Sequence, residues 1–187
     1  MIDRRQALAL FAGFAATPAL AQTGMSRMTA YAFSFAALKG DDIKLADYAG
    51  KPILVVNTAS QCGYTPQYAG LQDLWKRYRE RGLMIVGVPS NDFGGQEPGG
   101  VAEIEHTAHT GYGVNFPLAA KAEVRGPAQH PFYKWAATEK PLELPRWNFH
   151  KYLIGRDGHV AASFPAQVAP DDPRLIAAID KEFARAA

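Results

Sequence analysis

The chain has little cysteine: among its 187 residues, Cys62 is the only one. A disulfide needs two cysteines, so none can form within the chain. A Cys-x-x-Cys redox pair is excluded as well, because Thr65 stands at the second position, and this argues against a thioredoxin-like disulfide reductase. Any disulfide that Cys62 forms must therefore be with a thiol from another molecule.

Other absences exclude further classes of protein. The net charge is +2 and no Lys/Arg cluster occurs, so the chain has no basic footprint for nucleic acid. Outside the N-terminus there is no run of about 18 apolar residues that could span a membrane. The five histidines show no metal-ligand spacing, and we expect them at the surface. We therefore expect no metal and no cofactor, and the length favours one domain without repeats.

The N-terminus has the pattern of a secretory signal peptide. Arg4 and Arg5 precede an apolar stretch over residues 7–16, and Ala19-Leu20-Ala21 is a small-x-small cleavage pattern. A membrane anchor is the alternative, but the apolar core is short and Pro18 interrupts it. We expect export to the periplasm, and the arginine pair weakly resembles a twin-arginine signal.

These patterns divide the chain into three parts. Residues 1–21 are expected to be the signal peptide, with cleavage after Ala21, and residues 22–30 a linker of small residues. Residues 31–187 are expected to form the folded domain.

Periodicity predicts that this domain is α/β. A buried strand at 53–57, a helix at about 67–80 and a second buried strand at 83–88 form a right-handed parallel crossover. The other expected elements are a hairpin within 31–45, a helix at 101–110, a strand at 116–118, a helix at 131–138, a hairpin within 152–164 and a last helix capped by Asp171 or Asp172. Together they predict a mixed central sheet with helices on both faces and an N-terminal β-hairpin.

Cys62 lies in the turn between the first buried strand and its helix. The N–H groups and positive dipole at a helix start favour a thiolate over a thiol. A lone cysteine is more often a small buried apolar residue. Here, however, Ser60, Gln61 and Gly63 surround it, which indicates a turn rather than the middle of a strand. Cys62 is therefore a candidate for redox or nucleophilic chemistry.

Two further segments are candidates for the same site. Residues 89–99, Pro-Ser-Asn-Asp-Phe-Gly-Gly-Gln-Glu-Pro-Gly, follow the second parallel strand, and residues 146–152, Arg-Trp-Asn-Phe-His-Lys-Tyr, precede the C-terminal hairpin. Loops that follow the carboxyl ends of neighbouring parallel strands meet at one edge of the sheet. We therefore expect Cys62 and Gln96 to be neighbours. The glycine-rich loop lacks the pattern of a phosphate-binding loop.

Residues 57–65, residues 89–99 and Trp147-Asn148-Phe149-x-Lys151 resemble motifs of the glutathione peroxidase family, which has the thioredoxin fold. The motifs occur in order, and the resemblance covers roughly residues 31 to 184. It implies a catalytic tetrad of Cys62, Gln96, Trp147 and Asn148, with Cys62 as the peroxidatic cysteine. A thiolate would attack the peroxide, and the neutral N–H donors of the other three would stabilise it and then the leaving oxygen.

One departure from the family pattern concerns the reductant. Many non-animal relatives have a resolving cysteine on the helix before the tripeptide that matches Tyr112-Gly113-Val114, and this chain has Ala108 there. The resemblance therefore implies a one-cysteine cycle in which an external thiol, such as glutathione or a redox protein, reduces Cys62. The short segment between Trp135 and Trp147 resembles the monomeric, phospholipid-hydroperoxide-like branch. The alternative is a non-catalytic redox sensor that forms a mixed disulfide at Cys62.

Overall fold

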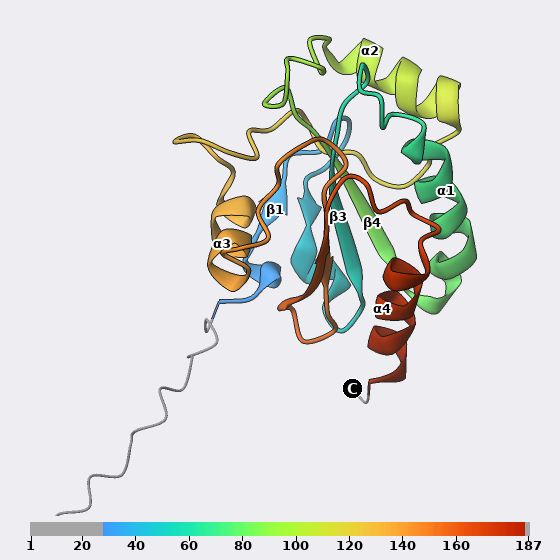
Figure 1. Cartoon of the computed structure of the whole chain (residues 1–187), viewed down its shortest axis with the longest axis vertical. Helices are drawn as coiled ribbons and strands as arrows, with labels where there is room; N and C mark the ends of the chain where they lie inside the picture. Colours follow the sequence, from blue (N-terminus) through green and yellow to red (C-terminus); the bar gives the residue numbers. More distant parts are fainter. Residues whose placement is uncertain (1–27, 186–187) are drawn as a thin grey trace, which may run out of the picture.

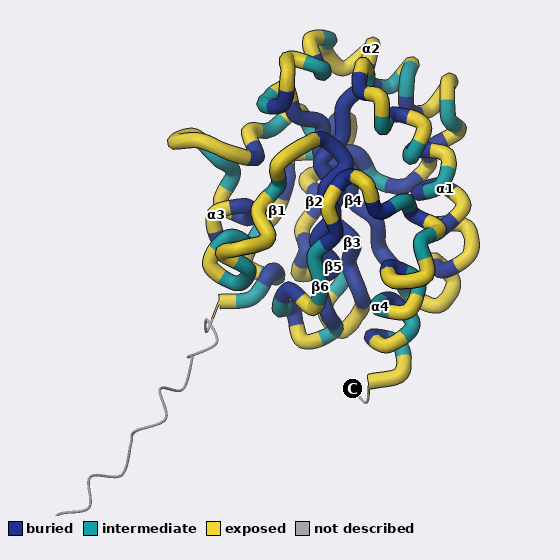
Figure 2. Tube along the Cα trace, in the orientation of Figure 1, coloured by how far each residue is buried: buried dark blue, intermediate teal, exposed yellow. Residues whose placement is uncertain are grey.

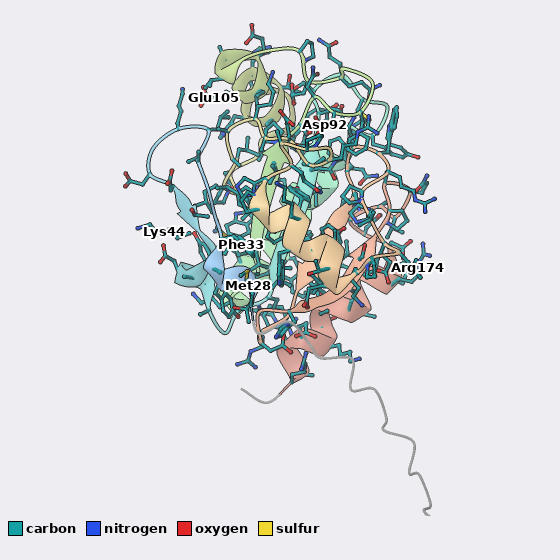
Figure 3. The ribbon with its side chains drawn as sticks, turned by 90° about the vertical axis from the view of Figure 1, so that its left-hand side faces the viewer. Met28, Phe33, Lys44, Asp92, Glu105 and Arg174 are labelled. Carbon is teal, nitrogen blue, oxygen red and sulfur yellow. The ribbon has the colours of Figure 1, made fainter. Side chains whose placement is uncertain are left out.

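The computed structural model describes residues 28–185. The expected signal peptide and most of the expected linker lie outside the described residues. The last part of that linker contacts the domain, because the Trp135 indole N–H donates to the Met28 carbonyl at 2.9 Å and the Ala30 N–H donates to the Gly158 carbonyl at 2.8 Å. Figure 3 labels Met28 beside Phe33, where the chain enters the domain next to the helix that carries Trp135.

The centre of the domain is a four-stranded mixed sheet with the order β4-β3-β5-β6. β3 (Ile53–Thr58) pairs in parallel with β4 (Met84–Pro89) and antiparallel with β5 (Lys151–Ile154), which pairs antiparallel with β6 (Val160–Phe164). All residues of β3, β4 and β5 are buried, as their apolar sequences predict, because helices cover both faces. Figure 2 shows these strands as the buried centre of the molecule.

Two hydrophobic cores lie on opposite faces of the sheet. α1 (Gln67–Tyr78) and α4 (Pro173–Ala184) cover one face, and α3 (Pro131–Glu139) covers the other (Figure 1). α1 buries Leu71, Leu74 and Tyr78, and it continues as a 3₁₀ turn, Arg79–Arg81, that ends at Gly82 with φ 105°. Of the two candidate caps of α4, Asp172 is the N-cap. The expected α/β class and the helices on both faces are confirmed.

The N-terminal hairpin is confirmed, although it is short. β1 (Ser34–Phe35) pairs antiparallel with β2 (Ile43–Lys44) in a separate two-stranded sheet. The chain before it, Ala30–Ala32, forms a 3₁₀ helix instead of the start of a strand. A second 3₁₀ helix, Leu45–Tyr48, leads from the hairpin to β3.

Two predicted elements differ in detail. The helix at 101–110 begins as α2 (Val101–Glu105) and continues as a π-helix over His106–Gly111. Residues 116–118 were expected to form a strand, but they make a single isolated bridge, between Leu118 and Gly87 of β4. Pro117 lacks an N–H, so this segment cannot complete a ladder.

Candidate active site

Three loops meet at one edge of the sheet. β3 and β4 are parallel, so the loops at their carboxyl ends emerge at the same edge, and β5 begins there because it runs antiparallel to β3. Figure 1 shows this edge at the upper end of the molecule, where α1 begins and α2 lies. Asp92, in the loop after β4, and Glu105, at the end of α2, mark the same end in Figure 3. The topology therefore brings together the three segments that the sequence singled out.

Cys62 lies in the turn between β3 and α1, as expected. Its side chain is mostly buried, with 7 % of the residue surface exposed. The Thr65 hydroxyl accepts from the Cys62 N–H at 3.0 Å and donates to the Ala59 carbonyl at 2.9 Å, so it fixes the turn. Among the described residues, the Cys62 sulfur has one hydrogen-bond donor, the Tyr64 backbone N–H at 3.4 Å.

Gln96 comes from the glycine-rich loop after β4 and lies next to the Cys62 turn. The Gln61 N–H donates to the Gln96 carbonyl at 2.9 Å, which joins the two loops as the parallel topology predicted. The Gln96 side-chain carbonyl accepts from the Asn148 amide at 2.9 Å. Within the described part of the chain, the Gln96 amide nitrogen has no acceptor, so its N–H groups are available to a ligand or to the sulfur.

Asn148 is fully buried, and its contacts differ from those expected of a donor to sulfur. Its side-chain nitrogen donates to the Gln96 side-chain carbonyl and, at 3.4 Å, to the Phe93 carbonyl. Both amide N–H groups are therefore occupied. This geometry orients the Gln96 amide so that its nitrogen faces away from Asn148.

Trp147 is the most exposed of the four predicted residues, with 39 % of its surface accessible. Its ring contacts the Phe93 ring, with centroids 6.1 Å apart, and its indole N–H has no acceptor among the residues described. A Cβ atom at Gly94 would lie 3.5 Å from the Trp147 ring and 3.6 Å from the Gln96 side chain. These are ordinary van der Waals distances, so glycine is favoured here by its φ of 69°, which turns the loop toward both side chains.

The sequence assigned no role to Glu97, a buried ionisable residue at this edge. Glu97 is fully buried, and its carboxylate accepts from the Ser60 hydroxyl at 3.2 Å, which ties the glycine-rich loop to the Cys62 turn. Burial raises the pKa of Glu97, although the hydrogen bonds from Ser60 and the charge of Lys121 oppose this. Because Glu97 directly follows Gln96, the only signal for it was its place in the motif.

His150 is a correction, because the sequence placed all the histidines at the surface. It is 4 % exposed, and its Nε2 lies 2.9 Å from the Ser163 hydroxyl. Burial, together with the charge of Lys151, lowers the pKa of His150 to about 4, so the imidazole is neutral near pH 7. Its ring also contacts the Tyr152 ring of β5, with centroids 4.7 Å apart.

Two hollows border this site. A hollow of about 640 Å³ is lined by Ser60, Gln61, Glu97 and the start of α2. A second, of about 530 Å³, is lined by Trp147, His150 and the exposed side chains Leu142 and Leu144. A reactant can therefore approach the three loops from two sides.

None of the described helices is long and apolar enough to cross a bilayer.

Comparisons with known proteins agree with this arrangement. Residues 30–137 match the family model for glutathione peroxidase. The chain is 45 % identical over 159 residues to the hydroperoxy fatty acid reductase gpx1 of Synechocystis sp.. This alignment covers 80 % of this chain and 94 % of that protein. The crystal structure of Trgpx in its apo form superposes with a TM-score of 0.69 at 32 % identity, over 86 % of this chain and 99 % of that one.

A more distant structure supports the fold alone. A thiol:disulfide interchange protein of the thioredoxin family from Chlorobium tepidum superposes with a TM-score of 0.59 at 15 % identity, over 81 % of this chain and 93 % of that one. The expected thioredoxin fold is therefore confirmed. The family match and the identity to curated peroxidases also show that the protein is an oxidoreductase that acts on peroxides. The chain belongs to the glutathione peroxidase family.

Proposed function

We propose that the protein is a one-cysteine thiol peroxidase that reduces hydrogen peroxide or organic hydroperoxides, including those of lipids, with an external thiol. The observation that carries this proposal is the meeting of Cys62 with Gln96 at one sheet edge, joined by the Gln61–Gln96 hydrogen bond. No second cysteine exists in the chain to complete a disulfide. The proposed partners are therefore a peroxide and a thiol, either glutathione or a redox protein.

The first step would oxidise Cys62. Its thiolate attacks the terminal oxygen of the peroxide, a sulfur–oxygen bond forms, and the O–O bond breaks. The leaving alkoxide or hydroxide takes up a proton to give an alcohol or water, and Cys62 becomes a sulfenic acid. Trp147 and Gln96 each have an N–H group without an acceptor among the described residues, and neutral donors of this kind stabilise both the thiolate and the leaving oxygen.

Asn148 would act differently from these two donors. Because its N–H groups already bind Gln96 and Phe93, we assign it the orientation of Gln96. The second and third steps need the external thiol. One thiol condenses with the sulfenic acid, which releases water and leaves a mixed disulfide. A second thiol attacks the external sulfur of this disulfide, which frees the Cys62 thiol and releases the two external thiols as their disulfide.

The hollow beside Trp147 supports organic hydroperoxides as substrates. Leu142, Leu144 and Trp147 are large apolar side chains that stay exposed, and all three line it. An apolar chain placed there would cover surface that otherwise contacts water. The relative from Synechocystis sp. is named for hydroperoxy fatty acids, which are substrates of this kind.

A turnover assay tests the proposal. We expect steady-state reduction of hydrogen peroxide and of a fatty acid hydroperoxide when glutathione or a thioredoxin system is in excess. Cys62→Ser should abolish it, because an alcohol is a far weaker nucleophile than a thiolate at neutral pH. If the wild-type protein is oxidised once but no thiol drives turnover, the sensor alternative replaces the peroxidase.

We also propose that the protein is exported to the periplasm and works there as a monomer. The support for export is the signal pattern of residues 1–21, with Arg4 and Arg5 before the apolar stretch. Periplasmic protein should begin at Gln22, which N-terminal sequencing would show. Replacement of both arginines by lysine should block export if the route is the twin-arginine one. Full-length protein that stays in the cytosol of cells with intact export would refute the localisation.

A further inference from the structure

Phe149 has an unusual backbone conformation next to the site. Its φ is 64°, and it is the single non-glycine residue with positive φ in the part of the chain that the structure describes. The left-handed region is unfavourable for a bulky residue, and such residues persist only where their surroundings hold them. The Phe149 side chain is fully buried, so glycine would lose core packing there. Something must therefore hold this backbone in place.

The hydrogen bonds around Phe149 form a β-bulge. The Phe149 N–H donates to the Asn57 carbonyl at 2.6 Å, and the Asn57 N–H donates to the His150 carbonyl at 3.3 Å. Two residues of the chain before β5 thus face one residue of β3, and the first of the two is left-handed. This pattern is usually built with glycine, and it redirects the chain near active sites.

Asn57 holds the chain before the bulge. Its side-chain amide donates to the Trp147 carbonyl at 3.1 Å, while its backbone pairs with Phe149 and His150. This one residue at the end of β3 therefore contacts the segment on both sides of Asn148. The bulge and the positions of Trp147 and Asn148 are parts of one structure.

Lys151 holds the bulge from the other side. The residue is completely buried, and its ammonium group donates to the Phe149 carbonyl and to the Gln67 side-chain carbonyl, both at 2.7 Å. Gln67 is the first residue of α1, which follows the Cys62 turn, and its amide nitrogen donates to the Ala166 carbonyl. Burial lowers the pKa of Lys151 to about 7, which shows that its charged form is desolvated here. A lysine that served only solubility would lie at the surface.

We propose that Lys151 is a positioning residue that fixes the left-handed bulge at Phe149 and links it to the start of α1. Through the bulge, and not through its contact with Gln67, it sets Trp147 and Asn148 relative to Cys62. The proposal deepens the proposed function, because it names a determinant of the same site. Lys151 touches neither the sulfur nor the substrate, so its effect passes through the bulge.

Replacement of Lys151 by methionine tests this. Methionine has a similar shape without a donor, so Lys151→Met leaves the Phe149 carbonyl unpaired and frees the bulge. We expect the peroxide-dependent oxidation of Cys62, followed by stopped flow, to slow by roughly ten- to a hundred-fold, the size of effect that a small misplacement of catalytic groups produces. Gln67→Met is the matched control. It removes the contact with α1 but keeps the Lys151–Phe149 bond, and it should change the rate by less than about three-fold.

A double-mutant cycle separates positioning from stability. In a Trp147→Phe background, Lys151→Met should slow oxidation less than in wild type, because one of the two displaced groups is already absent. Acrylamide quenching of Trp147, obtained by subtraction of the Trp147→Phe signal, should also change in Lys151→Met. If Lys151→Met folds poorly, the pair Lys151→Met and Gln67→Met removes the unpaired side-chain carbonyl of Gln67 and leaves the more peripheral Ala166 carbonyl without its donor, and the same rates and quenching are then measured on it.

The outcomes are decisive in both directions. Equal slowing of oxidation by Lys151→Met in the two backgrounds, or unchanged Trp147 quenching, would overturn the positioning role. Failure to fold of both Lys151→Met and the pair Lys151→Met and Gln67→Met would overturn it too, because Lys151 would then serve stability alone. The quenching measurement needs no turnover. If wild-type protein fails to reduce peroxide, the proposed function falls, but the link between Lys151 and Trp147 is still tested.

Discussion

Asn148 carries a prediction at the scale of a single residue. In the proposed mechanism Gln96 donates directly to the reacting atoms, so Gln96→Ala should slow the peroxide step roughly ten- to a thousand-fold. Asn148→Ala should slow it for the same reason, because Gln96 loses the 2.9 Å hydrogen bond that orients it. The two effects should therefore not add: in Gln96→Ala, removal of Asn148 should cost less than about three-fold further. Fully additive losses in stopped-flow rates would mean that Asn148 contacts the reacting atoms itself.

His150 predicts how stability depends on pH. Its pKa is about 4 in the folded protein, against 6.5 in the unfolded chain, so below pH 6.5 the unfolded state binds the proton more readily. Stability is then fully present above pH 6.5 and declines as the pH falls toward 4. The loss from this group between pH 7 and pH 5 should be roughly 2 kcal/mol, since each pKa unit corresponds to about 1.4 kcal/mol. Urea unfolding at the two pH values measures it.

His150→Gln is the control for this pH effect. Glutamine can still bind the Ser163 hydroxyl but does not titrate, so the variant should lose less stability on acidification than wild type. Lys151, with a pKa of about 7 in the folded protein, is partly deprotonated at pH 7, so just below pH 7 it adds a small slope of the same sign, which is common to both proteins. Glu97, with its raised pKa, acts in the opposite direction, but its contribution is common to both proteins. Identical slopes in wild type and variant would show that His150 is solvated.

At the scale of elements, the absence of a side chain at Gly87 lets residues 116–119 pack closely against β4. The Gly87 N–H donates to the Pro117 carbonyl at 3.0 Å, and the Ala119 N–H donates to the Gly87 carbonyl at 2.8 Å, so residues 117–119 lie along this strand. A Cβ atom at Gly87 would lie 2.6 Å from Leu118 and 3.3 Å from Phe116. This close approach requires a residue without a side chain. The strand expected at 116–118 is therefore a covering segment on β4.

Gly87→Ala should destabilise the domain by about 1–3 kcal/mol, the usual cost of overpacking a core. Chemical denaturation would measure the change in the free energy of unfolding. Gly50→Ala is a useful comparison, because nothing lies within 4 Å of a Cβ there, and any cost comes from its φ of 77° alone. A Gly87→Ala protein as stable as wild type would show that residues 116–118 can move away from β4 freely.

At the scale of the whole molecule, the single cysteine predicts how the protein is inactivated. Without a reductant, excess peroxide should carry Cys62 past sulfenic acid to sulfinic and sulfonic acid, because no other thiol exists to trap it. Intact mass spectrometry should show additions of two and three oxygens. With glutathione present, a mixed disulfide should appear instead. A sulfenic acid that persists through a large excess of peroxide and resists thiols would contradict the peroxidase cycle.

Ala108 extends this prediction to the helix at the entrance of the site. It is fully buried within the π-helix, where two-cysteine relatives were expected to carry the resolving thiol. Ala108→Cys should form a peroxide-dependent disulfide with Cys62 only if this helix unwinds, since a disulfide needs Cα atoms within about 7 Å. Non-reducing peptide mapping would detect the cross-link. Its absence at full Cys62 oxidation would show that the helix stays folded.

Most of the fold followed from local patterns in the sequence. The apolar run at 53–57 was enough to predict β3, because a strand buried on both faces is apolar at successive positions. The spacing of Leu71, Leu74 and Tyr78 was enough to predict α1, because a helix buried on one face is apolar every three or four residues. The predicted parallel pairing of β3 with β4 also predicted that Gln96 lies beside the Cys62 turn. Motifs selected Cys62, Gln96, Trp147 and Asn148 as the site residues, and their catalytic roles are proposals.

What the sequence did not contain were the partners of buried polar groups. The pattern that predicts a strand is the same whether Lys151 reaches solvent or, as here, the Phe149 carbonyl. His150 was placed at the surface because residue type alone favours exposure, yet it is buried against Ser163 and Tyr152. Such contacts join residues far apart in the chain, so only the packed tertiary structure decides which acceptor a buried donor finds.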